Sequence, residues 1–530
     1  MKRNKSVIFL ALVMWAGAFF MAACDGGNGV DNGDETPPPP SAPSAPTIQD
    51  IYSENRELAI LWNVVNNADT YTLYWNTTGG VTTSDSSVTN LRAPYYVHSG
   101  LSLFKTYSYA VTAVNTGGTS GLSNEMSALA AGVPAELWKR IAADTQDFDL
   151  LGNSVALSGD YAVAGAYGEG GAGIGRGAVY IFDRNYNGTD NWGQVKKLTA
   201  SDAANNDYFG YSADIDGDYV VSGAFYADSL GFDRGAAYVY YKNQGGTDNW
   251  GEVVKLTASD GADSDEFGYS VAIDGDYVVV GARSEDGAGS NRGAAYVFYR
   301  NQGGTDNWGE VAKLIASDAA DLDEFGFSVG ISGDNVVVGA RLEDGAGTDR
   351  GAAYVFNRNQ GGADNWGQVT KLTASSPENA AYFGYSVAVS GDYAVVGAIG
   401  EDGGGTNLGA VYIFDKDFGG TNNWGQVAQL TASDGEDGDE FGSSVAVDGD
   451  YFIVGAFYED GAGTSRGAAY IYGRNYGGAD AWGEVMKLTA LDAADQDWFG
   501  FSVAINGNYA VVGAMYEDGG GNQRGAIYIF

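Results

Sequence analysis

Acidic side chains recur in this chain in a pattern that could bind a metal ion. Asp residues stand at spacings of three and two before one predicted strand, and a Glu-Asp pair follows the next strand. Carboxylates of this kind, together with backbone oxygens, are the ligands that Ca²⁺ prefers. The calcium hypothesis rests on three copies of the pattern, whose candidate ligands are Asp260, Asp263, Asp265, Glu285, Asp286, Asp318, Asp321, Asp323, Glu343, Asp344, Asp434, Asp437, Asp439, Glu459 and Asp460.

Tryptophan is the second recurring residue type whose side chain could bind a ligand. Each repeated tryptophan begins a predicted strand, usually within Asp-Asn-Trp-Gly, and indoles beside Asn and Asp can stack against sugar rings. The alternative is that these indoles pack between neighbouring sheets. The candidates for glycan stacking are Trp192, Trp250, Trp308, Trp366, Trp424 and Trp482.

Residues for catalysis are scarce. His98 is the only histidine and Cys24 the only cysteine, which excludes Ser-His-Asp, Cys-His and zinc constellations. Paired carboxylates could serve a glycosidase. Such a site needs two carboxyl groups whose environments separate their pKa values, and seven near-equal copies do not provide one site of that kind. We therefore predict that the protein is not an enzyme. A formal net charge of −40 also excludes nucleic acid as a direct partner.

The elements that position these residues form one unit copied seven times. A glycine after a bulky apolar residue recurs every 58 residues, at Gly152, Gly210, Gly268, Gly326, Gly384, Gly442 and Gly500. The third copy contains four short β-branched and aromatic runs bounded by Gly, Asn and Asp, at 267–273, 277–282, 292–298 and 308–314. This pattern predicts four antiparallel strands joined by hairpins.

The ends of the array predict that it closes into a ring. The seventh copy stops at Phe530 after its third strand, and residues 137–144 fall in the frame of the missing fourth strand. A strand offered by the N-terminal side to the last sheet closes a propeller and removes its open edges. We therefore predict an all-β fold in which residues 135–530 form a seven-bladed β-propeller with four-stranded blades.

In such a blade, the loop that leads into the first strand (the approach loop) and the loop between the second and third strands (the middle loop) lie on one rim. About half of the 68 acidic residues belong to these loops. Cations could relieve their repulsion, and a solvated acidic surface is the alternative. The fifth copy, with only Glu378 in its approach loop, should bind calcium worst. A structural salt bridge or loop clamp within each blade, rather than ligand binding, is the expected role of Arg176, Arg234, Arg292, Arg350, Arg466 and Arg524.

The first 131 residues have a different organisation. Lys2, Arg3 and Lys5 precede an apolar stretch that ends before Cys24, so residues 1–23 are expected to be a signal peptide. Met21-Ala-Ala-Cys24 resembles the bacterial lipoprotein signal, which implies lipidation of Cys24. Residues 24–46 form a Pro- and Gly-rich linker. Residues 47–131 resemble a fibronectin type III domain, with Trp62 as the core tryptophan and Tyr107 as the corner tyrosine.

The 58-residue repeat itself resembles the FG-GAP family, which builds the propeller of integrin α subunits. The matching letters are Phe267-Gly268 with Gly281-Ala282 and their equivalents in most copies. The family's DxDxDG calcium loop is missing, because only a hairpin turn fits between those landmarks. Asp214-Ile-Asp216-Gly-Asp218 mimics the motif, but strand alternation would send its side chains to opposite faces.

Two functions remain open. The first is a protein that binds a protein or matrix partner through an acidic propeller face, with Ca²⁺ as a candidate cofactor, as the FG-GAP resemblance implies. The second is a multivalent carbohydrate-binding propeller that uses the repeated tryptophans. For both we expect an exported protein attached to a bacterial membrane through its lipid anchor, with the outer membrane or cell surface favoured over the inner membrane.

Overall fold

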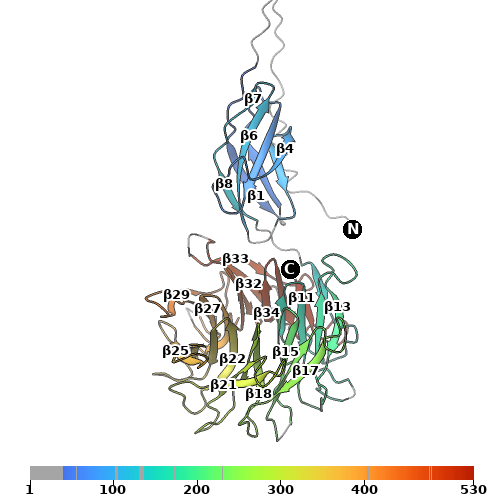
Figure 1. Cartoon of the computed structure of the whole chain (residues 1–530), viewed down its shortest axis with the longest axis vertical. Coiled ribbons are helices and arrows are strands. Elements are labelled where there is room, and N and C mark those ends of the chain that lie inside the picture. Colours follow the sequence, from blue (N-terminus) through green and yellow to red (C-terminus); the bar gives the residue numbers. More distant parts are fainter. Residues whose placement is uncertain are drawn as a thin grey trace, which may run out of the picture. The chain divides into compact units, whose positions relative to one another are not determined.

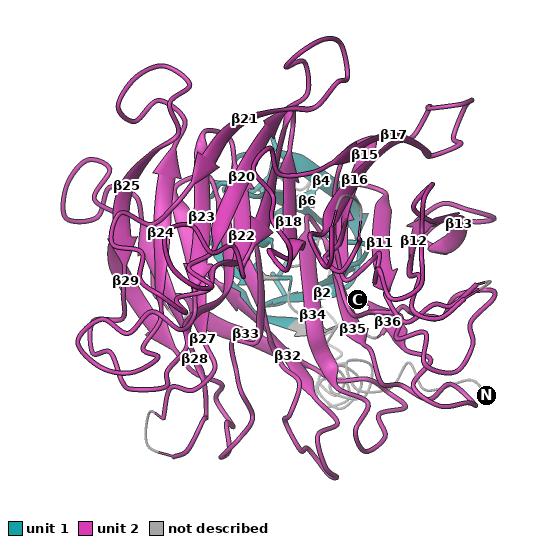
Figure 2. Cartoon of the chain, turned by 90° about the horizontal axis from the view of Figure 1, so that it is seen from below, with its two compact units in different colours: residues 1–135 teal, residues 136–530 magenta. Residues whose placement is uncertain are grey.

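The computed structural model describes residues 40–530 except 55–56, 102–104, 131–135, 172, 229–230, 403–404, 477 and 479. The proposed signal peptide and Cys24 lie outside this range. The described residues contain strands and no helix, and hence no helix that could cross a membrane. The chain divides into two compact units, Met1–Ala135 and Glu136–Phe530 (Figure 1, Figure 2).

The first unit is a sandwich of two antiparallel sheets. One sheet has the order β1-β2-β5, and the other has the order β4-β3-β6-β7 with β8 also paired to β6. The strands are β1 (Ile48–Glu54), β2 (Glu57–Trp62), β3 (Thr70–Asn76), β4 (Ser86–Leu91), β5 (Tyr95–His98), β6 (Thr106–Asn115), β7 (Gly118–Thr119) and β8 (Met126–Leu129).

The core of this sandwich is built around Trp62. Its ring is 2% exposed, and its centroid lies 5.5 Å from that of Tyr71 on the opposite sheet. Leu73 and Val111 belong to the same buried cluster, and Tyr107 is buried as well. The alternation of apolar and polar residues along these strands therefore gives the predicted fibronectin type III fold.

The second unit consists of seven four-stranded antiparallel sheets, or blades, numbered here in chain order. The first strands are β10 (Val155–Ser158), β14 (Ser212–Asp216), β18 (Phe267–Asp274), β22 (Phe325–Ser332), β26 (Phe383–Ser390), β30 (Ser444–Asp448) and β34 (Phe499–Asn506). The second strands are β11 (Tyr161–Ala166), β15 (Tyr219–Ala224), β19 (Tyr277–Ala282), β23 (Asn335–Ala340), β27 (Tyr393–Ala398), β31 (Tyr451–Ala456) and β35 (Tyr509–Ala514).

The third strands are β12 (Ala178–Asp183), β16 (Ala236–Tyr241), β20 (Ala294–Tyr299), β24 (Ala352–Asn357), β28 (Ala410–Asp415), β32 (Ala468–Gly473) and β36 (Ala526–Ile529). The fourth strands are β13 (Gly193–Leu198), β17 (Gly251–Leu256), β21 (Gly309–Leu314), β25 (Gly367–Leu372), β29 (Gly425–Leu430), β33 (Gly483–Leu488) and, in blade 7, β9 (Trp138–Arg140).

The ring is closed by the strand that precedes blade 1. β9 pairs antiparallel with β36, so that Lys139 lies opposite Tyr528 and Trp138 opposite Ile529. The first strands of successive blades contact one another, and β10 of blade 1 contacts β34 of blade 7. The predicted closure is thereby confirmed, and β36 has no open edge.

A repeated hydrogen bond joins the first hairpins of all seven blades. The last residue of each first strand accepts the backbone N–H of the hairpin glycine in the next blade. The pairs are Ser158 with Gly217, Asp216 with Gly275, Asp274 with Gly333, Ser332 with Gly391, Ser390 with Gly449, Asp448 with Gly507, and Asn506 with Gly159. The last pair returns to blade 1, so this circuit is complete. It also shows that Asp214-Ile-Asp216-Gly-Asp218 forms a hairpin, as predicted. The expectation of opposite faces was wrong for Asp214 and Asp216, because they are two residues apart in one strand and both accept backbone N–H groups of blade 3.

The repeated glycines allow neighbouring blades to approach closely. A Cβ atom on Gly281 would lie 2.1 Å from the carbonyl oxygen of Gly326 in the next blade. Gly268 has a φ of 93°, and a Cβ atom there would lie 2.3 Å from the carbonyl oxygen of Ala236 in the previous blade. Both positions therefore require glycine, which explains why they recur with the period of the blade.

Candidate functional site

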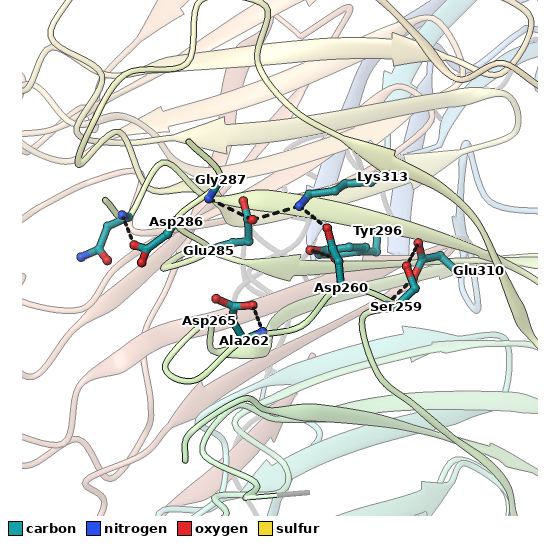
Figure 3. Close-up of polar contacts among 11 residues, drawn as sticks. Ser259, Asp260, Ala262, Asp265, Glu285, Asp286, Gly287, Tyr296, Glu310 and Lys313 are labelled. Carbon is teal, nitrogen blue, oxygen red and sulfur yellow. Dashed lines mark hydrogen bonds and ion pairs between the residues drawn. The ribbon is translucent and has the colours of Figure 1, made fainter. Parts of the chain in front are cut away.

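The acidic loops of blade 3 converge on a lysine from the outermost strand. Lys313 Nζ lies 2.7 Å from Asp260 Oδ2 and 2.9 Å from Glu285 Oε1 (Figure 3). Tyr296 donates its hydroxyl hydrogen bond to Asp260 at 2.9 Å, and the backbone N–H of Gly287 donates to Glu285 at 3.0 Å. The structure thus brings Asp260 and Glu285 together, but around an ammonium group of the protein itself.

This cluster recurs in six blades. The lysines Lys139, Lys197, Lys255, Lys313, Lys371 and Lys487 contact Asp492, Asp144, Asp202, Asp260, Asp318 and Asp434, respectively. In each case a third-strand tyrosine also donates to the aspartate. The second carboxylate is Glu517, Glu169, Glu285, Glu343 or Glu459, whereas blade 2 has Ala227 at that position.

Sequence reasoning missed these lysines, although a signal was present. Lys313 occupies a fixed position of the 58-residue period, and in blade 5 it is replaced by Gln429. The aspartate position of the same cluster is replaced there by Ser376. Both charges of the pair disappear in one blade, which is the pattern expected of two residues in contact.

Blade 5 retains the glutamate of the cluster without a lysine. Glu401 is 3% exposed, and no described residue makes a hydrogen bond to its Oε2 atom. Burial is the largest cause of a raised Glu401 pKa. In blade 5 the buried glutamate of the cluster therefore has no lysine to neutralise it.

The other predicted ligands are separated from the lysine cluster. Asp265 is 3% exposed and accepts the N–H of Ala262 at 2.6 Å, as Asp323 and Asp439 accept those of Ala320 and Glu436. Asp263 and Asp321 pair with Arg234 and Arg292, and Asp437 accepts the N–H of Thr406.

The repeated arginines join blades rather than clamp loops within a blade. Arg292 of the blade 3 middle loop lies 2.9 Å from Asp321 in the approach loop of blade 4. Arg234, Arg466 and Arg524 make the same contact to the next blade. The expected structural salt bridges are therefore present at these arginines. Their expected placement within one blade was wrong, because a middle loop lies beside the approach loop that follows it around the ring.

The described acidic residues do not fit a calcium ion. No group of three or more His, Cys, Asp or Glu side chains in this part of the chain is arranged to hold a metal. Ca²⁺ takes six to eight oxygen ligands, whereas Asp260 and Glu285 face an ammonium group and Asp265 faces a backbone N–H. Lysine and arginine supply the positive charge that the calcium hypothesis assigned to a metal.

The six repeated tryptophans are buried between blades. Their exposure ranges from 0% for Trp192 to 3% for Trp366. Trp308 of blade 3 packs edge-on against Tyr219 of blade 2, with ring centroids 5.6 Å apart. Trp192, Trp250, Trp308, Trp366, Trp424 and Trp482 thus offer no exposed ring face to a sugar, and the packing interpretation describes them.

Exposed aspartates form a second ring on the acidic rim. They recur once in the middle loop of six blades, and each accepts a backbone N–H five residues later in its own loop. No ion pair joins them to a described lysine or arginine. This aspartate ring consists of Asp228, Asp286, Asp344, Asp402, Asp460 and Asp518.

The buried carboxyls predict an unusual pH dependence of stability. Burial raises the pKa of Asp149, Asp265, Asp323 and Asp497 to about 6, above the unfolded value of 3.8. The folded state therefore binds protons that the unfolded state does not, and the free energy of unfolding should rise as pH falls from 7 to about 4.

Below about pH 4 the free energy of unfolding should instead fall as the pH falls. Burial raises the pKa of Asp260, but hydrogen bonds from Lys313 and Tyr296 outweigh burial and place the pKa below 3.8. The stability from this and equivalent aspartates is lost as pH falls through their folded pKa. Urea unfolding should give a maximum near pH 4 to 5. Asp265→Asn should raise the urea midpoint of unfolding at pH 7 and make the free energy of unfolding depend less on pH. A pH profile equal to that of the unmodified protein would contradict the raised pKa of Asp265.

Comparison with known proteins identifies the repeat. The family model of the FG-GAP repeat matches residues 136–182, 192–240, 250–298, 308–356, 366–414, 424–472 and 482–530. Such repeats suggest an integrin-like adhesion or interaction propeller, and these propellers and Fn3-like domains are typically non-enzymatic. The search of curated proteins found no match.

Two solved structures are similar to part of the chain. A Fn3-like protein from Clostridium thermocellum has 26% identity over 16% of this chain and 92% of its own, with a TM-score of 0.15. A structure titled FN3tt mut has 21% identity over 17% of this chain and 94% of its own, with a TM-score of 0.14. Each matched segment runs from the fourth strand of one blade through the first three strands of the next. The seven segments together cover more than half of the sequence, so the chain belongs to the FG-GAP repeat family.

Proposed function

We propose that this protein is an exported, lipid-anchored interaction protein that binds a basic protein or matrix partner through the acidic rim of its propeller. The aspartate ring is the observation that carries the proposal. Its carboxylates are exposed and have no described cationic partner, in contrast to the aspartates of the lysine clusters. Interaction rather than catalysis agrees with the FG-GAP family.

The physical basis is electrostatic complementarity. Like charges spaced around one rim attract a basic surface and raise its association rate, and the effect weakens with salt. Because the exposed aspartates occur on six blades, many weak contacts can act together. No metal is needed for this mode of binding.

The anchor rests on the sequence before the described residues. Cys24 follows Met21-Ala-Ala, and the part of the linker before Pro40 would keep the folded units away from the membrane surface. From Ser41 onward the chain packs on the first unit, where Asn115 donates to the Ser41 carbonyl oxygen and Pro43 and Pro46 are buried. Mass spectrometry of the mature protein tests this part of the proposal. A free N-terminus elsewhere than Cys24 would contradict it.

Neutralising part of the aspartate ring is expected to weaken binding to a polycation. The triple variant Asp286→Asn, Asp344→Asn, Asp460→Asn retains the acceptors of the loop hydrogen bonds while removing three charges. Its affinity for immobilised polylysine should fall about tenfold at low salt, equivalent to about 1.4 kcal/mol. Biolayer interferometry over a salt series measures this change.

A matched control removes three charges from the opposite rim. Asp183, Asp415 and Asp417 also accept backbone N–H groups, so their substitution by Asn is conservative. This second triple variant should bind polylysine nearly as well as the unmodified protein. Equal losses in the two variants would mean that only net charge matters, and the acidic rim would not be the binding face.

A further inference from the structure

A pocket of about 620 Å³ opens on the acidic rim where blades 6, 7 and 1 meet. Four aromatic side chains line it, each from a different loop. Phe148 comes from the approach loop of blade 1 and Trp498 from that of blade 7, while Tyr458 and Tyr516 come from the middle loops of blades 6 and 7. Its volume falls within the usual range of ligand pockets, roughly 300–1,000 Å³.

The aromatic side chains hold one another in place but keep exposed surface. The Trp498 ring centroid lies 4.3 Å from that of Tyr516 and 5.1 Å from that of Tyr458, and the Trp498 ring stacks on Phe501 behind it. Phe148 is 57% exposed, and the other three pocket aromatics are half-buried. Unlike the six interblade tryptophans, these rings can therefore contact a ligand.

Comparison among the blades shows that this combination occurs at one place in the ring. Positions 58 residues apart are equivalent, yet Trp498 is the only tryptophan at its position, where the other copies have Leu150, Tyr208, Glu266, Glu324, Tyr382 and Glu440. At the position of Phe148 the other copies have Asn206, Ser264, Leu322, Ala380, Gly438 and Gln496. Packing of the common blade does not require these aromatic residues, because the other blades form without them.

Apart from Asp518, which belongs to the aspartate ring, the polar side chains of the lining that are free to bind a ligand are neutral. Asp495 already pairs with Arg466 at 2.9 Å, and Asp518 accepts the backbone N–H of Gln523. No described residue makes a hydrogen bond to the side chains of Ser465, Gln496 or Gln523. A hydroxyl and two amides are thus available to donate to and accept from a ligand.

We propose that this pocket binds a carbohydrate. The C–H face of a sugar ring would stack on Trp498, and ring hydroxyls would exchange hydrogen bonds with Gln496, Gln523 and Ser465. An aromatic wall beside amide groups suits a neutral ligand with one apolar face and many hydroxyls. Of the two carboxylates in the lining, Asp495 is paired with Arg466, whereas Asp518 is exposed and has no described cationic partner. An arginine derivative, which Asp518 would attract, is therefore one arm of the test. The proposal goes beyond protein binding by the aspartate ring and does not depend on it.

Ligand-observed saturation-transfer NMR on the full chain tests the proposal with maltose, cellobiose, lactose and N,N′-diacetylchitobiose. At least one disaccharide should receive saturation, and Trp498→Ala should weaken its binding at least about tenfold, as expected for a central aromatic contact. Tyr208→Ala, at the equivalent position of blade 2, should leave binding unchanged. Phe148→Ser provides a second pocket variant at an exposed position, so a folding defect of Trp498→Ala cannot obscure the result.

Three outcomes would overturn the proposal. They are the absence of saturation transfer to every disaccharide, unchanged binding in both pocket variants, and binding of N-acetyl-arginine amide without any disaccharide. Polylysine binding of the same variants separates this proposal from the proposed function. Trp498→Ala should retain it, and the triple variant of the aspartate ring should retain disaccharide binding.

Discussion

Replacing residues 137–141 with a Gly-Ser linker of equal length should lower the free energy of unfolding by about 3–5 kcal/mol. The change removes β9, and with it the backbone pairing to β36 and the ion pairs of Lys139 with Asp492 and Glu517. Glu517 is 8% exposed and would lose its cation. The bare edge of β36 should also promote self-association. Urea unfolding and analytical ultracentrifugation measure the two effects.

The matched control places the same linker at residues 244–248, an exposed loop between β16 and β17. This variant should unfold at nearly the urea midpoint of the unmodified protein and remain monodisperse to the same extent. A linker at 137–141 that had no larger effect than the control would show that β9 is dispensable for closure.

Lys313→Met should lower the free energy of unfolding by about 2–3 kcal/mol, because removal of one partner leaves a mostly buried carboxylate without its cation. Methionine retains much of the apolar stem, so the lost charge dominates. Glu285 is 9% exposed and retains only the Gly287 N–H as a donor among the described residues. Urea denaturation followed by circular dichroism provides the measurement at neutral pH.

Gln429→Met is the control that the chain itself offers. Gln429 occupies the lysine position of blade 5, where Ser376 replaces the aspartate, so its substitution should change the free energy of unfolding by less than about 0.5 kcal/mol. Similar losses for Lys313→Met and Gln429→Met would contradict the charge argument. Addition of calcium should not restore the stability of Lys313→Met.

Much of the architecture could be predicted because its causes are local and repeated. Gly268 and Gly281 recur where the backbones of neighbouring blades touch, and hairpin residues such as Gly275 and Asp276 bound each strand. The frame shared by residues 137–144 and the fourth strands predicted that this segment completes the last blade, and the structure places Trp138 opposite Ile529. Each of these signals repeats with the period of the fold.

The site was harder to predict, because acidic composition does not specify the partner of each carboxylate. Asp260 and Lys313 are 53 residues apart, and they meet only because the approach loop returns to the outermost strand of its own blade. Asp263 and Asp265 recur together at the same spacing in several copies, but their environments differ. Asp263 pairs with an arginine, whereas Asp265 is buried and accepts a backbone N–H. The tryptophan period left packing and glycan stacking open, and burial decided for packing, because the period alone does not distinguish a buried indole from an exposed one.

Seven blades, their four strands and the borrowed closing strand follow from the sequence by itself, because backbone turns and apolar alternation act over a few residues and are copied in every unit. Only the tertiary structure decided that Lys313 neutralises Asp260 and Glu285, that Arg292 joins two blades, and that Trp498 rather than Trp308 has an accessible ring. Ion pairing and exposure depend on which loops the ring brings together, and that neighbourhood exists only in the folded chain.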